Sequence, residues 1–195
     1  MGKVDFVKAA RKNWTCQKCG KPIDKGTSYY RGEVNFGPTF IRCTECKLEP
    51  WEVTSSDYQR AIGRLVAKWQ EEYSLDEDGR DQLIDDLEAL QDEQQEKLDN
   101  MPEQLQDSVT GQLLQDRIDG LECAKDALSL IDIDDLKEQA VNYAIDSNEY
   151  EVEEYPDYQT VMDGNFGEEI KQDAISEFEY NLTSDIEDAL GEIDW

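Results

Sequence analysis

The sequence predicts a mainly α-helical protein with a small N-terminal module of short β-hairpins. Two pairs of closely spaced cysteines lie within the first 46 residues, and apolar residues recur every three to four positions from about residue 54 onward. The charge changes along the chain as well. Residues 1–68 contain 13 Lys and Arg against 7 Asp and Glu, a net charge of +6, whereas residues 69–195 contain 6 against 40, a net charge of −34.

These three observations predict the domain organisation. A chain of 195 residues is long enough for a small module and a larger helical region. We expect a basic module over residues 1–53, an acidic helical hairpin or bundle over 54–148, and an acidic C-terminal helical segment over 149–195.

Within the N-terminal module, residues 4–12 predict a short amphipathic helix that leads to Trp14. The residues between the cysteine pairs are rich in β-forming side chains, and glycines and a Gly-Pro pair punctuate them as turns. The expected strands therefore include Tyr29, Tyr30, Val34, Phe36, Phe40 and Ile41.

The acidic region opens with three expected helices. Residues 54–73 predict a helix capped by Thr54, Ser55 or Ser56. Residues 80–101 predict a second helix, with Gly79 either between the two or inside one long helix. A third begins at a Thr110 cap. Because about ten residues join the last two, and each has one apolar stripe, we expect them to pack as an antiparallel hairpin.

The last third of the chain predicts further helices. One covers residues 133–147, with Leu136, Ala140, Tyr143 and Ala144 facing inward. Residues 148–158 predict an acidic linker, and residues 167–190 predict one or two final helices.

The two cysteine pairs, Cys16-x2-Cys19 and Cys43-x2-Cys46, are separated by 23 residues. Each pair places two sulfur atoms on a tight turn, and two such turns complete a tetrahedron around Zn²⁺. The chain contains no histidine, so four thiolates are the expected ligands and leave no position for water. We therefore predict a zinc ribbon with one structural Zn²⁺. Cys123 has no such partner, and we expect it to be a small buried side chain.

The order Cys16-x2-Cys19-Gly20, then "PIDKGTSYY", then "IRCTECKLEP" resembles a widespread group of uncharacterised bacteriophage proteins with an N-terminal zinc ribbon. The segment "NMPEQLQDSVTGQLLQDRIDGLE" is similar to a second signature of that group. The resemblance covers about residues 1–130. It implies a phage origin and a four-cysteine zinc ribbon followed by an acidic helical region, and it implies no activity.

Residue composition argues against an enzyme. Without histidine there is no Ser–His or Cys–His pair, and no GxSxG motif or Gly-rich phosphate loop occurs. Adjacent carboxylates are expected by chance in so acidic a chain. No apolar run approaches the ~18–20 residues of a membrane span, and residues 1–14 contain no apolar stretch long enough for the core of a secretory signal, so we expect neither. We expect a cytoplasmic protein, in the host cell cytoplasm if a phage encodes it, where thiols stay reduced.

The acidic region suggests the first function. A helical scaffold with rows of carboxylates can imitate B-DNA, which presents one negative charge per about 1.7 Å of its axis. We expect binding and inhibition of a host protein with a basic, DNA-binding surface, as a DNA mimic against host defence. The candidate partner-binding residues are Asp85, Asp86, Glu88, Asp92, Glu93 and Glu96.

Two alternatives remain open. The basic module predicts a nucleic-acid-binding or transcription-modulating ribbon, because cations interleaved with aromatic rings suit phosphate contacts and base stacking. Its candidate residues are Lys18, Lys21, Lys25, Tyr29, Tyr30, Arg31, Phe36 and Arg42. An adaptor or structural role is the other alternative, and a homodimer formed through the helices of residues 80–130 is compatible with each reading.

Overall fold

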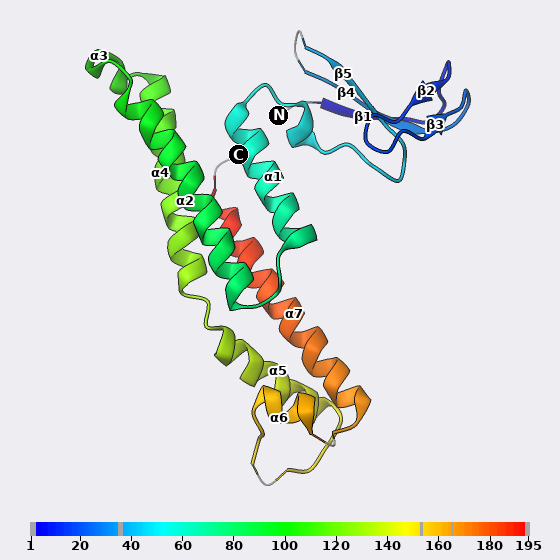
Figure 1. Ribbon diagram of the computed structural model, residues 1–195, viewed down its shortest axis with the longest axis vertical. Helices are drawn as coiled ribbons and strands as arrows, with labels where there is room; N and C mark the ends of the chain where they lie inside the picture. Colours follow the sequence, from blue (N-terminus) through cyan, green and yellow to red (C-terminus); the bar gives the residue numbers. More distant parts are fainter. Residues whose placement is uncertain (1–2, 35–36, 153, 165, 194–195) are drawn as a thin grey trace. The chain divides into compact units, whose positions relative to one another are not determined.

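The computed structural model describes residues 3–34, 37–152, 154–164 and 166–193 (Figure 1). The chain forms two compact units, one that ends at Lys68 and one that begins at Trp69. The protein is mainly α-helical, and in the described residues the short antiparallel strands all belong to the N-terminal unit. This confirms the predicted fold class of a small ribbon followed by helices.

The N-terminal unit contains two small antiparallel sheets. The larger has the order β1–β4–β5, with β1 at Lys3–Val7, β4 at Tyr29–Glu33 and β5 at Thr39–Arg42. The smaller pairs β2 (Trp14–Thr15) with β3 (Pro22–Ile23). Each cysteine pair begins directly after a strand, because Cys16 follows β2 and Cys43 follows β5. The β4–β5 hairpin lies between the two pairs, where the sequence predicts one.

The prediction of a helix over residues 4–12 is wrong. Val4, Phe6 and their neighbours form β1, which pairs with β4 in the register Phe6↔Tyr30. The apolar spacing of so short a segment is compatible with both structures. The strand is selected by a partner more than twenty residues further along the chain, and a local pattern does not contain that information.

The interior of this sheet region is small. Its buried residues are Ala10, Cys16, Ile23, Tyr29, Ile41 and Cys43, with Val7, Trp14 and Cys46 packed against them. Two of the six buried residues are therefore cysteines of the predicted metal site. After the second cysteine pair come a 3₁₀ helix, η1 (Pro50–Val53), and helix α1 (Asp57–Glu72), in which the Ser56 hydroxyl accepts a hydrogen bond from the Gln59 N–H.

In the second unit, α2 (Glu77–Asp99), the short α3 (Glu103–Gln106) and α4 (Val109–Ser129) form a hairpin. Figure 1 shows α2 and α4 side by side with α3 at their end. The helices are antiparallel, since Arg80 near the start of α2 donates to the Ile131 carbonyl beyond α4 at 2.9 Å. Gln91 in the middle of α2 donates to the Ile118 carbonyl at 3.3 Å. The predicted hairpin is confirmed.

The two long helices of this hairpin begin with the same local structure. Asp76 caps α2 by accepting from the Gly79 N–H, and Ser108 caps α4 by accepting from the Gly111 N–H. The expected Thr110 cap is therefore wrong by two residues. The chain between Glu72 and Glu77 is not helical, so α1 and α2 are separate helices, and Gly79 lies inside α2 rather than between the two.

The remaining helices are α5 (Ile133–Ser147), α6 (Tyr158–Asp163) and α7 (Glu168–Gly191). Helix α5 packs extensively along α7, which also contacts α4. Helix α5 has the predicted bounds, but Tyr143 is 52% exposed and does not face inward as expected. Helix α6 follows the predicted linker of residues 148–158, in a stretch for which the sequence predicts no element. None of the helices within the described ranges is long and apolar enough to cross a bilayer.

Candidate metal centre

Cys16, Cys19, Cys43 and Cys46 converge in the N-terminal unit, with their sulfur atoms all within 4.8 Å of one another. The Sγ atoms of Cys19 and Cys43 are 3.7 Å apart. This is far longer than the ~2.05 Å of a disulfide bond. Four sulfurs at about 2.3 Å from one ion in a tetrahedron would be about 3.8 Å apart. The cluster therefore has the composition and spacing needed to hold a metal ion.

Backbone conformation after each pair completes the two turns. Gly20 has φ of +74°, and its N–H donates to the Cys16 carbonyl at 2.9 Å. Lys47 follows the second pair at the equivalent position and also has a positive φ, of +33°. Left-handed backbone is strained for a residue with a Cβ atom. The backbone at Lys47 is therefore strained in the second turn, whereas the first turn has a glycine at this position and is not strained.

Gln17 joins the first cysteine turn to the strand that leads into the second. The side-chain oxygen of Gln17 accepts a hydrogen bond from the Ile41 backbone N–H at 2.9 Å. The backbone N–H of Gln17 donates to the Ile41 carbonyl at 3.0 Å. Two residues later, Cys43 begins the second pair. Gln17 thus fixes the spacing of the two turns. The sequence does not identify Gln17, because it is one of the two variable residues of the CxxC motif and its hydrogen bonds to Ile41 leave no sequence pattern.

The protein environment shifts the thiol pKa values in opposite directions. Burial raises the pKa of Cys16, but hydrogen bonds from the backbone N–H groups of Cys19, Cys43 and Lys18 together outweigh it and lower the pKa to about 6. Hydrogen bonding to Cys19 and burial raise the pKa of Cys46 to about 12. Without a cation, the four sulfurs do not all ionise at neutral pH, so a metal ion must displace protons when it binds.

Three basic residues of the N-terminal unit form ion pairs with carboxylates. Lys21 forms an ion pair with Glu45, whose hydrogen bond is the main reason that the Lys21 pKa is raised. Arg31 pairs with Glu33. Arg42 donates to Glu52 at 3.0 Å, and its side chain is only 11% exposed. These three cations neutralise acidic groups of their own unit.

The aromatic candidates for nucleic-acid binding are also partly enclosed. Tyr29 is buried in the small interior, and Tyr30 is half-buried against Phe6, with ring centroids 5.1 Å apart. Lys18 and Lys25 are exposed. Phe36 lies outside the described residues. The structure brings the cysteines together, but it does not assemble the basic and aromatic candidates into an open surface of free cations and ring faces.

The acidic candidates lie on α2, and four of them share one face. Asp85, Glu88, Asp92 and Glu96 are exposed and follow one another at helical spacings of three or four residues. Exposed carboxylates at the same spacing extend this line in both directions, although one of them, Asp81, is paired with Arg80. We name the whole set the α2 row: Asp78, Asp81, Asp85, Glu88, Asp92, Glu96 and Asp99.

The other two acidic candidates, Asp86 and Glu93, leave this line. Asp86 is half-buried and accepts a hydrogen bond from the Tyr73 hydroxyl, whereas Glu93 pairs with Lys97 at 2.6 Å. The sequence identified the helix correctly as acidic, but it did not separate the row from these two side chains.

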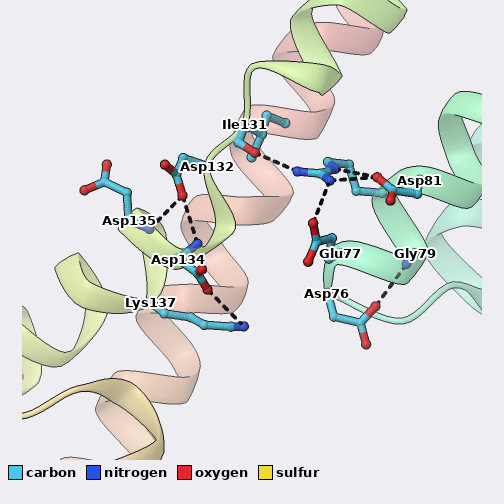
Figure 2. Close-up of polar contacts among 10 residues, drawn as sticks. Asp76, Glu77, Gly79, Asp81, Ile131, Asp132, Asp134, Asp135 and Lys137 are labelled. Atoms are coloured by element: carbon cyan, nitrogen blue, oxygen red, sulfur yellow. Dashed lines mark hydrogen bonds and ion pairs between the residues drawn. The ribbon is translucent and has the colours of Figure 1, made fainter.

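Carboxylates near the start of α2 and the start of α5 have structural roles (Figure 2). Arg80, whose side chain is 14% exposed, pairs with Glu77 and Asp81 while it donates to the Ile131 carbonyl. Asp132 caps α5 by accepting from two N–H groups, at Asp134 and Asp135. Negative charge at a helix N-terminus is stabilising. In the described residues, the four cysteines are the one group with the proximity of metal ligands.

Cys123 differs from the expectation. Cys123 is exposed on α4. The buried face of the helix passes through Leu121 and Ala124, and Cys123 lies off that face. The prediction of a small buried side chain is wrong.

Searches of protein-family models, curated proteins and solved structures found no match to this chain.

Proposed function

We propose that this chain is a non-enzymatic binding protein whose acidic helices bind and inhibit a protein with a basic, DNA-binding surface. The observation that carries the proposal is the α2 row, an exposed line of carboxylates along a helix that packs against α4. The resemblance to phage proteins suggests a host DNA-binding or defence protein as the partner. The proposal treats the N-terminal unit as a structural module.

The spacing of the row supports imitation of a nucleic-acid backbone. Neighbouring carboxylates are separated by three or four residues, which corresponds to about 5 Å along a helix that rises 1.5 Å per residue. One strand of B-DNA carries a charge every 3.4 Å, so the row has about two-thirds of that linear charge density. A basic groove that accepts a phosphate strand therefore meets a comparable series of anions.

For the N-terminal unit, we propose that the bound metal is Zn²⁺. Four thiolates in a tetrahedral arrangement suit zinc, which needs no redox chemistry to stabilise a fold. Elemental analysis of purified protein should give one zinc ion per chain, and Cys16→Ser should lose it. Folded protein that contains no metal, or an iron–sulfur chromophore in its place, would contradict this assignment.

The test of the binding proposal compares two variants with equal charge. One removes four charges of the α2 row, with Asp85→Asn, Glu88→Gln, Asp92→Asn and Glu96→Gln. The matched control removes four exposed carboxylates elsewhere, with Glu138→Gln, Glu169→Gln, Glu179→Gln and Glu187→Gln. Bacterial proteins retained by each immobilised variant are compared, with double-stranded DNA as the competitor.

We expect the wild-type protein and the control to retain DNA-binding proteins that DNA displaces, and the row variant to lose them. Equal loss in both variants would reduce the effect to net charge and refute the role of the row. Retention of DNA itself would favour the nucleic-acid-binding alternative. No contact described above favours that alternative, since Lys21, Arg31 and Arg42 are paired within their own unit.

A further inference from the structure

Three large aliphatic side chains are exposed where α2 turns back into α4. Leu105 on α3 is 52% exposed, and Val109 and Leu113 on α4 are 83% and 46% exposed. The interior stripe of α4 is formed by other residues, among them Leu114, Ile118 and Leu121. We name Leu105, Val109 and Leu113 the tip patch. These residues are apolar, yet the hairpin leaves about half or more of each side chain exposed.

Hydrogen bonds at the start of α4 link the backbone positions of the three tip-patch residues. Val109 and Leu113 lie one helical turn apart and therefore share a face of α4. The Leu105 carbonyl accepts from the Ser108 N–H at 3.0 Å, and the Ser108 side chain caps α4. Leu105 is thus connected by a hydrogen bond to the residue that begins the helix carrying the other two side chains.

Gln106 fixes the same turn from the other side. Its side chain donates to the Met101 carbonyl at 3.2 Å, and its backbone oxygen lies against Gly111, where an added Cβ atom would be only 1.9 Å away. The chain therefore crosses α4 in close contact at Gly111. This contact leaves α3 little freedom to turn Leu105 inward.

The charge around the tip patch restricts what can cover it. Residues 98–116 contain four carboxylates, at Asp99, Glu103, Asp107 and Asp116, and the nearest cations flank this stretch at Lys97, which pairs with Glu93, and at Arg117. All four are exposed. If a second copy docked through the same patch, it would bring four more carboxylates against these, and juxtaposed like charges disfavour association. A partner with an apolar face and basic flanks would pair with both features.

We propose that the tip patch binds a basic amphipathic helix of the partner protein. Two aliphatic side chains one turn apart match the contact that one helix offers to another, and the carboxylates on either side select Lys and Arg in the flanks of the incoming helix. The inference rests on the proposed function and makes it more specific. The α2 row supplies long-range attraction, and the tip patch supplies the apolar anchor.

The test uses two labelled synthetic peptides with the full-length protein. Both contain the same numbers of Leu and Lys, but one places all Leu on a single helical face and the other scrambles the order. Fluorescence anisotropy at physiological ionic strength gives the affinity of each. We expect the wild-type protein to bind the amphipathic peptide at least about tenfold more tightly than the scrambled one.

The variant Val109→Ser with Leu113→Ser should lose about tenfold in affinity for the amphipathic peptide and leave that for the scrambled peptide unchanged. The matched control is Leu130→Ser, which removes an aliphatic side chain that is 84% exposed outside the patch. Because large parts of these side chains are exposed, the variants should fold, and circular dichroism would check this. Equal affinity for both peptides, or equal effects of the two variants, would overturn the proposal.

Two further outcomes separate this inference from the proposed function. If the α2 row variant loses the retained DNA-binding proteins while the tip variant keeps them, the tip patch is refuted and the proposed function stands. If the wild-type protein dimerises in analytical ultracentrifugation and the tip variant does not, a second copy covers the patch, and the basic helix is refuted.

Discussion

Lys47 and Gly20 occupy equivalent positions after the two cysteine pairs, and both have positive φ. The glycine accepts this conformation without strain, whereas the lysine does not. We predict that Lys47→Gly stabilises the zinc-loaded protein by about 0.5–1 kcal/mol, since relief of strain exceeds the added flexibility of the unfolded chain. Urea unfolding at a fixed zinc concentration measures the change.

Lys18→Gly is the matched control for this substitution. Lys18 is exposed in the first cysteine turn and is not among the residues with positive φ. Glycine there should only add flexibility to the unfolded chain and should destabilise the protein slightly. If both substitutions changed the free energy of unfolding by the same amount, strain at Lys47 would not be the cause.

Gln94 is fully buried between α2 and α4, and neither atom of its amide has a hydrogen-bond partner within the described part of the chain. It continues the apolar stripe of Leu83, Leu87 and Leu90. A buried amide without partners costs about 1–3 kcal/mol. Gln94→Leu should therefore stabilise the protein by about that amount in thermal or urea unfolding.

The control for Gln94 is Gln82→Leu, at an exposed position of the same helix. We expect that change to remain within about 0.5 kcal/mol of the wild-type stability. A loss of stability in Gln94→Leu would show that the amide makes a favourable interaction inside the hairpin.

At the scale of the elements, α2 and α4 share a glycine at the third position after the cap. A Cβ atom at Gly79 would lie 1.8 Å from the Ser74 carbonyl oxygen, and one at Gly111 would lie 1.9 Å from that of Gln106. In both helices, the preceding chain crosses the first turn in close contact. The same close contact between the first turn and the chain before it therefore occurs at the start of both helices.

Alanine normally stabilises a helix relative to glycine by about 1 kcal/mol. We predict the opposite sign at these two positions. Gly79→Ala and Gly111→Ala should each destabilise the protein by about 2 kcal/mol or more, because a backbone atom has to move. Gly191→Ala in α7 is the control, since nothing lies within 4 Å of the added atom, and it should be neutral or stabilising.

The longer elements could be predicted from sequence, and the shorter ones could not. Helix α5 has the predicted bounds because its cap at Asp132 and its apolar spacing are both local signals. Strand β1 depends on pairing with β4, and α6 has only six residues, too few for a clear period. In the same way, CxxC spacing identified the four sulfurs. Gln17 and Lys47 depend on backbone hydrogen bonds and dihedral angles that spacing does not encode.

At the scale of the whole molecule, the two units differ in how they are stabilised. The sheet cluster of the N-terminal unit has six buried residues, two of them cysteines, and the rest of that unit adds Leu48, Val53, Tyr58, Ile62 and Leu65. The second unit buries long stripes on α2, α4, α5 and α7. Small domains with little apolar interior commonly require a metal to remain folded. The metal should therefore stabilise one unit and leave the other almost unaffected.

We predict that chelation of the metal unfolds residues 3–46 selectively. Hydrogen exchange measured by mass spectrometry should show lost protection of β1, β4 and β5, with α2, α4, α5 and α7 still protected. Cys16→Ser should reproduce this pattern without a chelator, and Cys123→Ser, at an exposed position, should not. Loss of protection throughout the chain, or no loss anywhere, would contradict the independence of the two units.

The α2 row has one more consequence, which concerns the solution around it. Its charges are about 5 Å apart, closer than the Debye length of about 8 Å at physiological ionic strength, so sodium or potassium ions must accumulate beside the helix. A basic partner that binds there frees these counterions into bulk solvent. Part of the binding energy is then an entropy of released salt, and the slope of affinity against salt concentration counts the carboxylates that the partner covers.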